Sequence, residues 1–138
     1  MEEVNEKIFK IIKEDNFTKF LGIRCLEIRK GYAKYSMVVN KNMINFHNVA
    51  HGGVIFSLAD VAFAAASNSE GIRSLALVVE ICYRKPVHEG EEIIAEAVEE
   101  SGGKRTAVYK IKVYNKDGEI IALCQATVYR TGENIITD

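Results

Sequence analysis

The chain has 138 residues, of which 48% are hydrophobic and 27% are charged, and its formal net charge at pH 7 is −1. These values are typical of one folded domain, expected here over residues 1–138, and they exclude a disordered chain. The near-zero charge provides no general attraction to nucleic acid or to an anionic membrane, and no apolar run reaches the roughly 18 uninterrupted residues of a membrane span.

The N-terminal residues and the cysteines indicate a cytoplasmic protein. Acidic side chains occupy the first residues, where a secretory signal requires positive charge. The three cysteines lack CxxC spacing and fall in strand-like runs, so we expect reduced core residues. The three histidines belong to no HExxH or Cys/His ligand pattern, and we predict neither a metal site nor a cofactor.

The first third of the chain changes from helical to strand periodicity. Apolar residues recur at helical spacing over 3–14, with Glu and Lys between them, which predicts an amphipathic N-terminal helix within residues 1–16. Residues 23–39 contain alternating strand formers with a turn at Lys30-Gly31. Residues 40–50 are rich in Asn and His and are expected to form a loop.

A largely apolar helix is predicted from Gly52 to about residue 68, where Asn68–Gly71 ends it. It is apolar on nearly all sides and should therefore be buried. Asp60 is its only charged residue, and an unpaired carboxylate in such a place is costly. Ser57, Ala64 and Ser67 share its helix face, and we interpret this stripe of small and polar residues as the wall of a cleft.

Four strand-like segments follow the helix. Residues 75–83 form a nearly continuous apolar run, which favours a central strand. Residues 91–99, 106–114 and 120–129 complete an antiparallel meander with a hairpin at Asp117-Gly118, and residues 132–138 are expected to form a frayed tail. The sequence therefore predicts an α+β fold in which one long helix is wrapped by an antiparallel sheet of five to six strands.

The start of the central helix is suited to stabilising a developing oxyanion. The first N–H groups near Gly52-Gly53 have no intrahelical partner and point outward at the positive end of the helix dipole. Asp60 lies about 11 Å further along the axis, too far to share one small reacting centre with that terminus. We therefore hypothesise a homodimer in which Asp60 of one subunit faces the helix terminus of the other.

The segment NFHNVAHGG, followed by SLAD, resembles the hotdog-fold acyl-CoA thioesterases of the phenylacetic-acid-degradation (PaaI-like) family, and the wider likeness covers about residues 17–131. The resemblance implies hydrolysis of an acyl-CoA to free acid and coenzyme A, with no metal or redox cofactor. It implies that Asp60 is general base or nucleophile, that the Gly52 amide polarises the thioester carbonyl, that Asn45 orients the reacting groups and that His51 supports the loop. It favours a phenylacetyl-type acyl group and a dimer of dimers, that is, a homotetramer.

The remaining candidates are substrate-binding residues. Gly53 lets a ligand approach the backbone, Phe56 or Phe63 could line an acyl pocket, and basic side chains could contact the phosphates of coenzyme A. The basic candidates are Arg84, Lys85, Lys104 and Arg105. The sequence departs from some relatives at Ala64 and Ala76, where those proteins have a hydroxyl that helps to place water or substrate.

Structural interpretations of the same residues remain open. Asp60 could be a structural acid paired with Arg73 or with an amide. Gly52 and Gly53 could serve close packing alone. Asn45 could serve only to shape a turn, and His51 only to form hydrogen bonds within the loop. Two other functions also remain: a non-catalytic acyl-CoA-binding protein, and a hotdog hydratase or dehydratase with His51 as its base.

Overall fold

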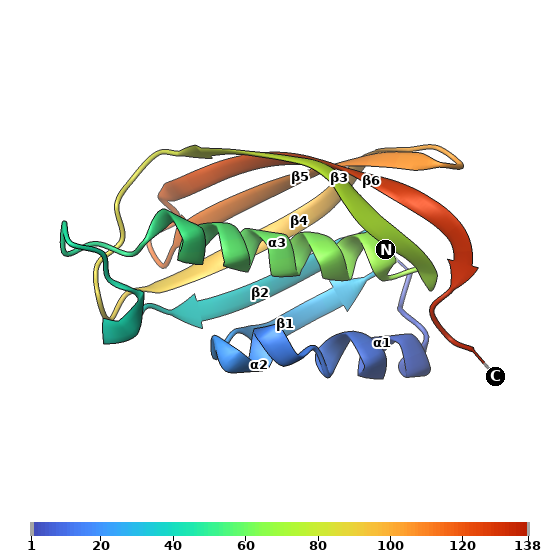
Figure 1. Cartoon of the computed structure of the whole chain (residues 1–138), viewed down its shortest axis with the longest axis horizontal. Helices are drawn as coiled ribbons and strands as arrows, with labels where there is room; N and C mark the ends of the chain where they lie inside the picture. The colour runs from blue at the N-terminus through green and yellow to red at the C-terminus, as the bar shows by residue number, and fades with distance from the viewer. Residues whose placement is uncertain (1, 138) are drawn as a thin grey trace.

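The computed structural model describes residues 2–137, so Met1 and Asp138 of the predicted domain lie outside the described residues. Figure 1 shows a long helix enclosed by a curved sheet, with two short helices below it. The helical elements are α1 (Glu6–Lys13), α2 (Asn16–Phe20), the 3₁₀ turn η1 (Lys41–Met43) and α3 (Gly52–Asn68). The strands are β1 (Arg24–Arg29), β2 (Tyr32–Val38), β3 (Ile72–Tyr83), β4 (Glu92–Gly102), β5 (Thr106–Asn115) and β6 (Ile120–Asn134).

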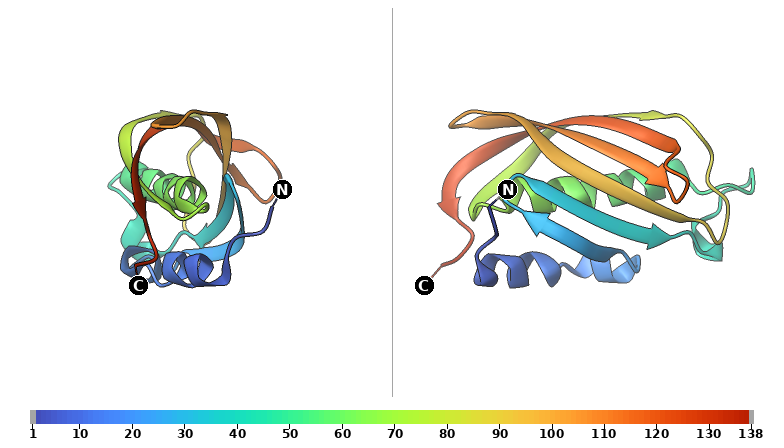
Figure 2. Two further views of the ribbon diagram at one scale, coloured as in Figure 1. Left: turned by 90° about the vertical axis from the view of Figure 1, so that its right-hand side faces the viewer. Right: turned by 180° about the vertical axis from the view of Figure 1, so that it is seen from behind.

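All six strands form one antiparallel sheet in the order β1-β2-β4-β5-β6-β3. The sheet arches over α3, and α1 and α2 lie across the side that the sheet leaves open (Figure 2). This arrangement confirms the predicted α+β hotdog fold with a buried central helix.

The core lies between α3 and the concave face of the sheet. Leu58 and Ala62 of α3 are fully buried. Phe63 is 2% exposed and contacts the ring of Tyr109 on β5 edge-on, with the ring centroids 5.6 Å apart. Because apolar residues cover almost every side of α3, the helix is held by packing around most of its circumference.

The position of β3 corrects one prediction, because this strand forms an edge of the sheet and not its centre. The continuous apolar run predicts a central strand, yet Leu75, Leu77 and Val78 are each more than half exposed. Continuous hydrophobicity identifies a strand but does not show whether the strand lies at the centre or at the edge of its sheet.

The two chain ends also differ from their predictions. The N-terminal segment forms two helices, because Asp15 caps a new helix by accepting a hydrogen bond from the Thr18 N–H at 3.0 Å. The frayed tail expected from residue 132 is wrong for residues 132–134, which extend β6, and the Ile135 N–H donates to the Gly71 carbonyl at 2.8 Å. Residues of the two N-terminal helices and Ile135 line one cavity with the C-terminal half of α3.

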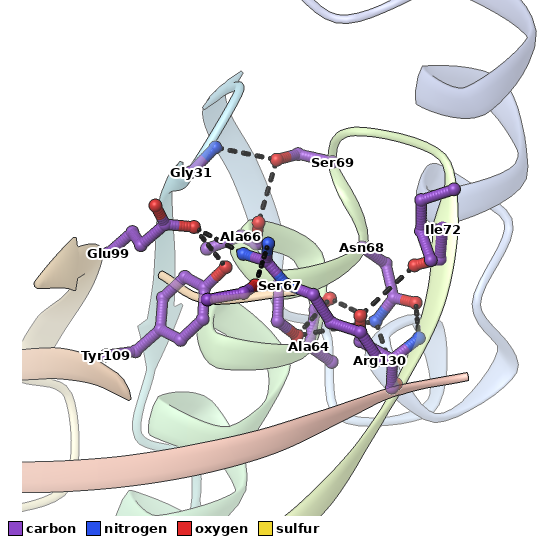
Figure 3. A network of polar contacts seen from close by, with 12 residues as sticks. Gly31, Ala64, Ala66, Ser67, Asn68, Ser69, Ile72, Glu99, Tyr109 and Arg130 are labelled. Atoms are coloured by element: carbon purple, nitrogen blue, oxygen red, sulfur yellow. Dashed lines mark hydrogen bonds and ion pairs between the residues drawn. The ribbon is translucent and has the colours of Figure 1, made fainter. Parts of the chain in front are cut away.

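A network of polar contacts fixes the C-terminal end of α3 (Figure 3). Ser69 is fully buried, and its hydroxyl donates to the Ala66 carbonyl at 2.7 Å and accepts from the Gly31 N–H at 2.8 Å. The Asn68 side chain donates to the Ala64 carbonyl at 2.9 Å and accepts from the Ser74 N–H at 2.8 Å. These side chains satisfy backbone groups that the helix end and the following turn would otherwise leave unpaired.

A half-buried ion pair, Glu99–Arg130, lies beside this network. Glu99 of β4 accepts from the Arg130 guanidinium of β6 at 2.8 Å and from the Tyr109 hydroxyl at 3.0 Å. The same guanidinium donates to the Gly103 carbonyl at 3.0 Å. The contacts join β4, β5 and β6 at the end of the sheet that holds the C-terminus of α3 (Figure 3).

Candidate active site

The first turn of α3 presents one free backbone donor. His51 is the N-cap, and its Nδ1 accepts from the Gly53 N–H at 3.1 Å. No residue among 2–137 accepts a hydrogen bond from the Gly52 N–H. The Gly52 amide, at the positive end of the helix dipole, is therefore available to an acceptor from a ligand or solvent.

The position of His51 also fixes its tautomer. Because Nδ1 accepts from the Gly53 N–H, the neutral ring carries its proton on Nε2 and cannot accept another proton there. Protonation at Nδ1 would remove the helix cap. This geometry agrees with a structural role for His51 in the loop and disfavours His51 as the base of a hydratase.

Tyr83, at the end of β3, packs against Gly52. Its hydroxyl donates to the Gly52 carbonyl at 2.9 Å, and a Cβ atom on Gly52 would lie only 3.2 Å from the Tyr83 Cζ and hydroxyl oxygen. Partial burial raises the pKa of the Tyr83 phenol, which keeps it a hydrogen-bond donor. The close approach of the Tyr83 ring therefore explains why residue 52 is a glycine. The sequence analysis missed Tyr83, because it lies 31 residues from Gly52 and no local pattern marks it.

Asn45 shapes the loop that leads into α3. Its Oδ1 accepts from the His47 N–H at 2.9 Å and from the Val49 N–H at 3.4 Å. The same turn contains Asn48 in the left-handed region, with φ 64°. The side-chain oxygen of Asn45 thus supports the turn. Within residues 2–137, the Asn45 side chain forms no hydrogen bond with Asp60 or Gly52.

Asp60 is half-buried and lines a cavity between α3 and the N-terminal helices. No residue among 2–137 forms a hydrogen bond or an ion pair with its carboxylate. Arg73, its suggested structural partner, instead places Nε 3.6 Å from Glu133 Oε2. Burial raises the pKa of the Asp60 carboxyl, and the negative charge of Asp15 raises it further. An unpaired, partly desolvated carboxylate is more typical of a reactive group than of a structural one.

The cavity has a volume of about 520 Å³ and mostly apolar walls. Ile11, Ile12 and Phe17 come from the N-terminal segment, and Val61 and Ala64 come from α3. Volumes of this size are common for small-molecule sites. Asp60 and Ala64 of the predicted stripe therefore line a real cavity, whereas Ser57 uses its hydroxyl to donate to the Gly53 carbonyl at 2.8 Å.

The predicted site residues do not all converge within one chain. Gly52 and Asp60 are eight residues apart on one helix, or about 12 Å. Phe63 belongs to the core and does not line the cavity, and Phe56 is half-buried without lining it. Gly53 is engaged with His51.

The four basic residues are also separated. Arg84 and Lys85 follow β3 near the start of α3, whereas Lys104 and Arg105 lie in the β4–β5 turn at the opposite end of the sheet (Figure 1). All four are exposed, and Lys85 contacts Glu119. One chain therefore does not bring the two pairs to a single phosphate group.

Neither a membrane-spanning helix nor a cluster of metal ligands is found within the described residues. No helix within residues 2–137 has the length and apolar character needed to cross a membrane. Within the same residues, no three His, Cys, Asp or Glu side chains lie close enough to hold a metal ion.

Comparison with known families gives the site its context. The family model described as the thioesterase superfamily matches residues 47–122, which include Gly52, Asp60 and Tyr83. The chain belongs to the thioesterase superfamily. This thioesterase is 50% identical over 122 residues to a protein of Archaeoglobus fulgidus named a putative esterase, with 88% of this chain and 79% of that protein covered.

Two comparisons point to the PaaI branch. The thioesterase is 37% identical to the acyl-coenzyme A thioesterase PaaI of Escherichia coli, covering 89% of this chain and 88% of that protein. The solved structure of the E. coli PaaI protein from the phenylacetic acid degradation operon matches with a TM-score of 0.91 and 33% identity, covering 97% of this chain and 100% of the other. The predicted resemblance to PaaI-like thioesterases is confirmed.

Proposed function

We propose that this thioesterase hydrolyses a small aryl acyl-CoA, of the phenylacetyl type, to the free acid and coenzyme A. The observation that carries the proposal is the Asp60 carboxylate, which has no partner among the described residues and lines an apolar-walled cavity of about 520 Å³. Such a cavity can hold a compact acyl group while the carboxylate reaches a water molecule beside the thioester.

In the proposed reaction, Asp60 takes a proton from water as the water oxygen attacks the thioester carbonyl carbon. The carbonyl oxygen gains negative charge, which a Gly52 N–H stabilises as an oxyanion-hole donor. Collapse of the tetrahedral intermediate breaks the C–S bond and releases coenzyme A, whose sulfur takes up the proton. The raised pKa of Asp60 makes it a stronger base once ionised.

We further propose that the reacting Asp60 and Gly52 come from two subunits. The exposed edge of β3 supports this proposal, because it presents unpaired backbone groups beside Leu75, Leu77 and Val78. The other edge, β1, is short and is covered at Arg29 by a bridge to Glu3. A second copy paired along β3 would bury the apolar side chains, and the assembly mass should be an even multiple of 15.4 kDa.

The aromatic acyl group is supported by the likeness to the E. coli acyl-coenzyme A thioesterase of the phenylacetic acid degradation operon. The apolar walls from Ile11, Ile12 and Phe17 are also compatible with an aryl ring. No feature of the cavity walls selects an aryl group over a medium-chain acyl group, so the proposal is tested with both.

The test is thiol release from phenylacetyl-, hydroxybenzoyl-, hexanoyl- and palmitoyl-CoA by the wild type, Asp60→Asn and Asp117→Asn. Asp117 is an exposed carboxylate in the β5–β6 turn, and its variant is the matched control. We expect Asp60→Asn to lower kcat/KM by at least about 10²-fold and Asp117→Asn to leave it unchanged.

The other outcomes identify the alternatives. An intact thioester with altered unsaturation would indicate a lyase, and binding of acyl-CoA without turnover would indicate a sensor. Equal thiol release by the wild type and Asp60→Asn, at unchanged assembly mass, would overturn Asp60 as the base.

A further inference from the structure

The cavity that contains Asp60 holds a second carboxylate, Asp15, between α1 and α2. Asp15 caps α2, and its Oδ2 accepts from the Thr18 N–H at 3.0 Å and from the Thr18 hydroxyl at 2.6 Å. These two bonds fix the position of the carboxylate at the cavity wall. Two acidic groups from distant parts of the sequence, the exposed Asp15 and the half-buried Asp60, therefore line one cavity.

Within residues 2–137, no cation forms an ion pair with either carboxylate. The charged or titratable groups that line the cavity besides them are Arg73 from β3 and Tyr35 from β2. Arg73 is directed to Glu133 of β6. Tyr35 is 1% exposed, and burial raises the pKa of its phenol, so it remains neutral. The residues that α1 and the end of β6 contribute are apolar: Ile11, Ile12 and Ile135.

We propose that Asp15 is a positioning residue that tunes Asp60: its negative charge, fixed in the same cavity by the cap of α2, increases the proton affinity of Asp60 and so its strength as a base. The inference rests on the proposed function, in which Asp60 accepts a proton from water. A fixed negative charge close to a partly buried carboxyl group disfavours ionisation of that group. The direction of the Asp60 pKa agrees, with burial as the larger cause and Asp15 as the second.

The negative charge of Asp15 can be removed while its hydrogen bond that caps α2 is kept. Asparagine and serine both retain a side-chain oxygen that can accept from the Thr18 N–H, so Asp15→Asn and Asp15→Ser isolate the charge. Glu14→Gln is the matched control, because Glu14 is the neighbouring exposed carboxylate and does not line the cavity.

The measurement is the pH dependence of kcat/KM for phenylacetyl-CoA, from pH 4 to 9. We expect both Asp15 variants to lower the acid-limb inflection by about half a pH unit, which raises kcat/KM about two- to threefold at pH values well below the wild-type inflection. The high-pH plateau should fall by less than about twofold, because Asp60 becomes a weaker base. Glu14→Gln should follow the wild-type profile.

A readout independent of activity keeps this inference separate from the proposed function. The carboxyl carbon of Asp60 can be titrated by NMR in the wild type and in Asp15→Asn, even if no acyl-CoA is hydrolysed. A lower Asp60 inflection in Asp15→Asn supports the inference. An unchanged Asp60 titration in both Asp15 variants, or an equal shift in Glu14→Gln, would overturn it.

Discussion

The two ends of α3 differ in how their backbone groups are satisfied. At the C-terminal end, Asn68 and Ser69 close the last turn with side-chain hydrogen bonds, and the Glu99–Arg130 pair lies close by (Figure 3). At the N-terminal end, the Gly52 N–H has no acceptor among the described residues. One helix thus has a terminus that contributes to stability and a terminus that remains available for chemistry, and single substitutions should separate these two roles.

The largest effect is expected at the N-terminal end, from Gly52→Ala. The added Cβ would lie 3.2 Å from the Tyr83 Cζ, so the ring or the first turn must shift. We expect kcat/KM to fall by about 10²- to 10³-fold through loss of the oxyanion donor geometry, measured by thiol release with circular dichroism to confirm folding.

Mixed assemblies test whether Gly52 and Asp60 act from different subunits. If the site combines Asp60 of one subunit with Gly52 of the other, refolding Gly52→Ala together with Asp60→Asn creates one intact site in each mixed dimer. Activity should then return to a substantial fraction of the wild type. Failure of the mixture to regain activity, with mixed dimers demonstrated by mass, would contradict a shared site.

The second effect is expected at the C-terminal end, from Ser69→Ala. This change removes the acceptor of the Gly31 N–H and the donor to the Ala66 carbonyl inside a fully buried site. We expect the free energy of unfolding to fall by about 1–3 kcal/mol, measured by urea denaturation, with unchanged kcat/KM. Ser101→Ala, at an exposed position of β4, is the control, and a loss of activity without a loss of stability would contradict the separation of roles.

The smallest effect concerns Asp60 and stability. Its pKa in the folded state lies above its ordinary value of 3.8. The folded state therefore binds the proton more tightly than the unfolded state, and stability decreases as pH rises from 3.8 through the raised pKa. At neutral pH the wild type carries this penalty in full.

Asp60→Asn should consequently melt a few degrees above the wild type at pH 7, and the difference should shrink as pH falls towards 3.8. Thermal scans at equal protein concentration measure it. A melting temperature for Asp60→Asn that is lower than that of the wild type at pH 7 would show that the carboxylate has a stabilising partner.

The sequence predicted those features that depend on local pattern. Helical periodicity and the Gly52-Gly53 start placed α3 and made Asp60 conspicuous, because a lone charge in an apolar helix is visible without tertiary information. The turns at Lys30-Gly31 and Asp117-Gly118 also lie where predicted.

The remaining features depend on tertiary contacts that no local pattern contains. The 12 residues of β3 look like a central strand, and only the pairing order places them at an edge. Asp15 and Tyr83 enter the site through folding, from 45 residues before Asp60 and 31 residues after Gly52. The phosphate-binding role predicted for the basic residues remains a prediction, because their grouping depends on how subunits assemble.

The origin of the cavity walls has a consequence for how such an enzyme can diversify. Gly52, Asp60 and Tyr83 lie inside the stretch matched by the family model, residues 47–122, whereas Ile11, Ile12, Asp15 and Phe17 lie before it. In the proposed reaction, the residues that cleave the bond therefore lie within one segment of the gene, whereas part of the cavity wall is encoded in another. Substitutions of its apolar wall residues, Ile11, Ile12 and Phe17, should change which thioester is accepted while Asp60 and Gly52 stay intact.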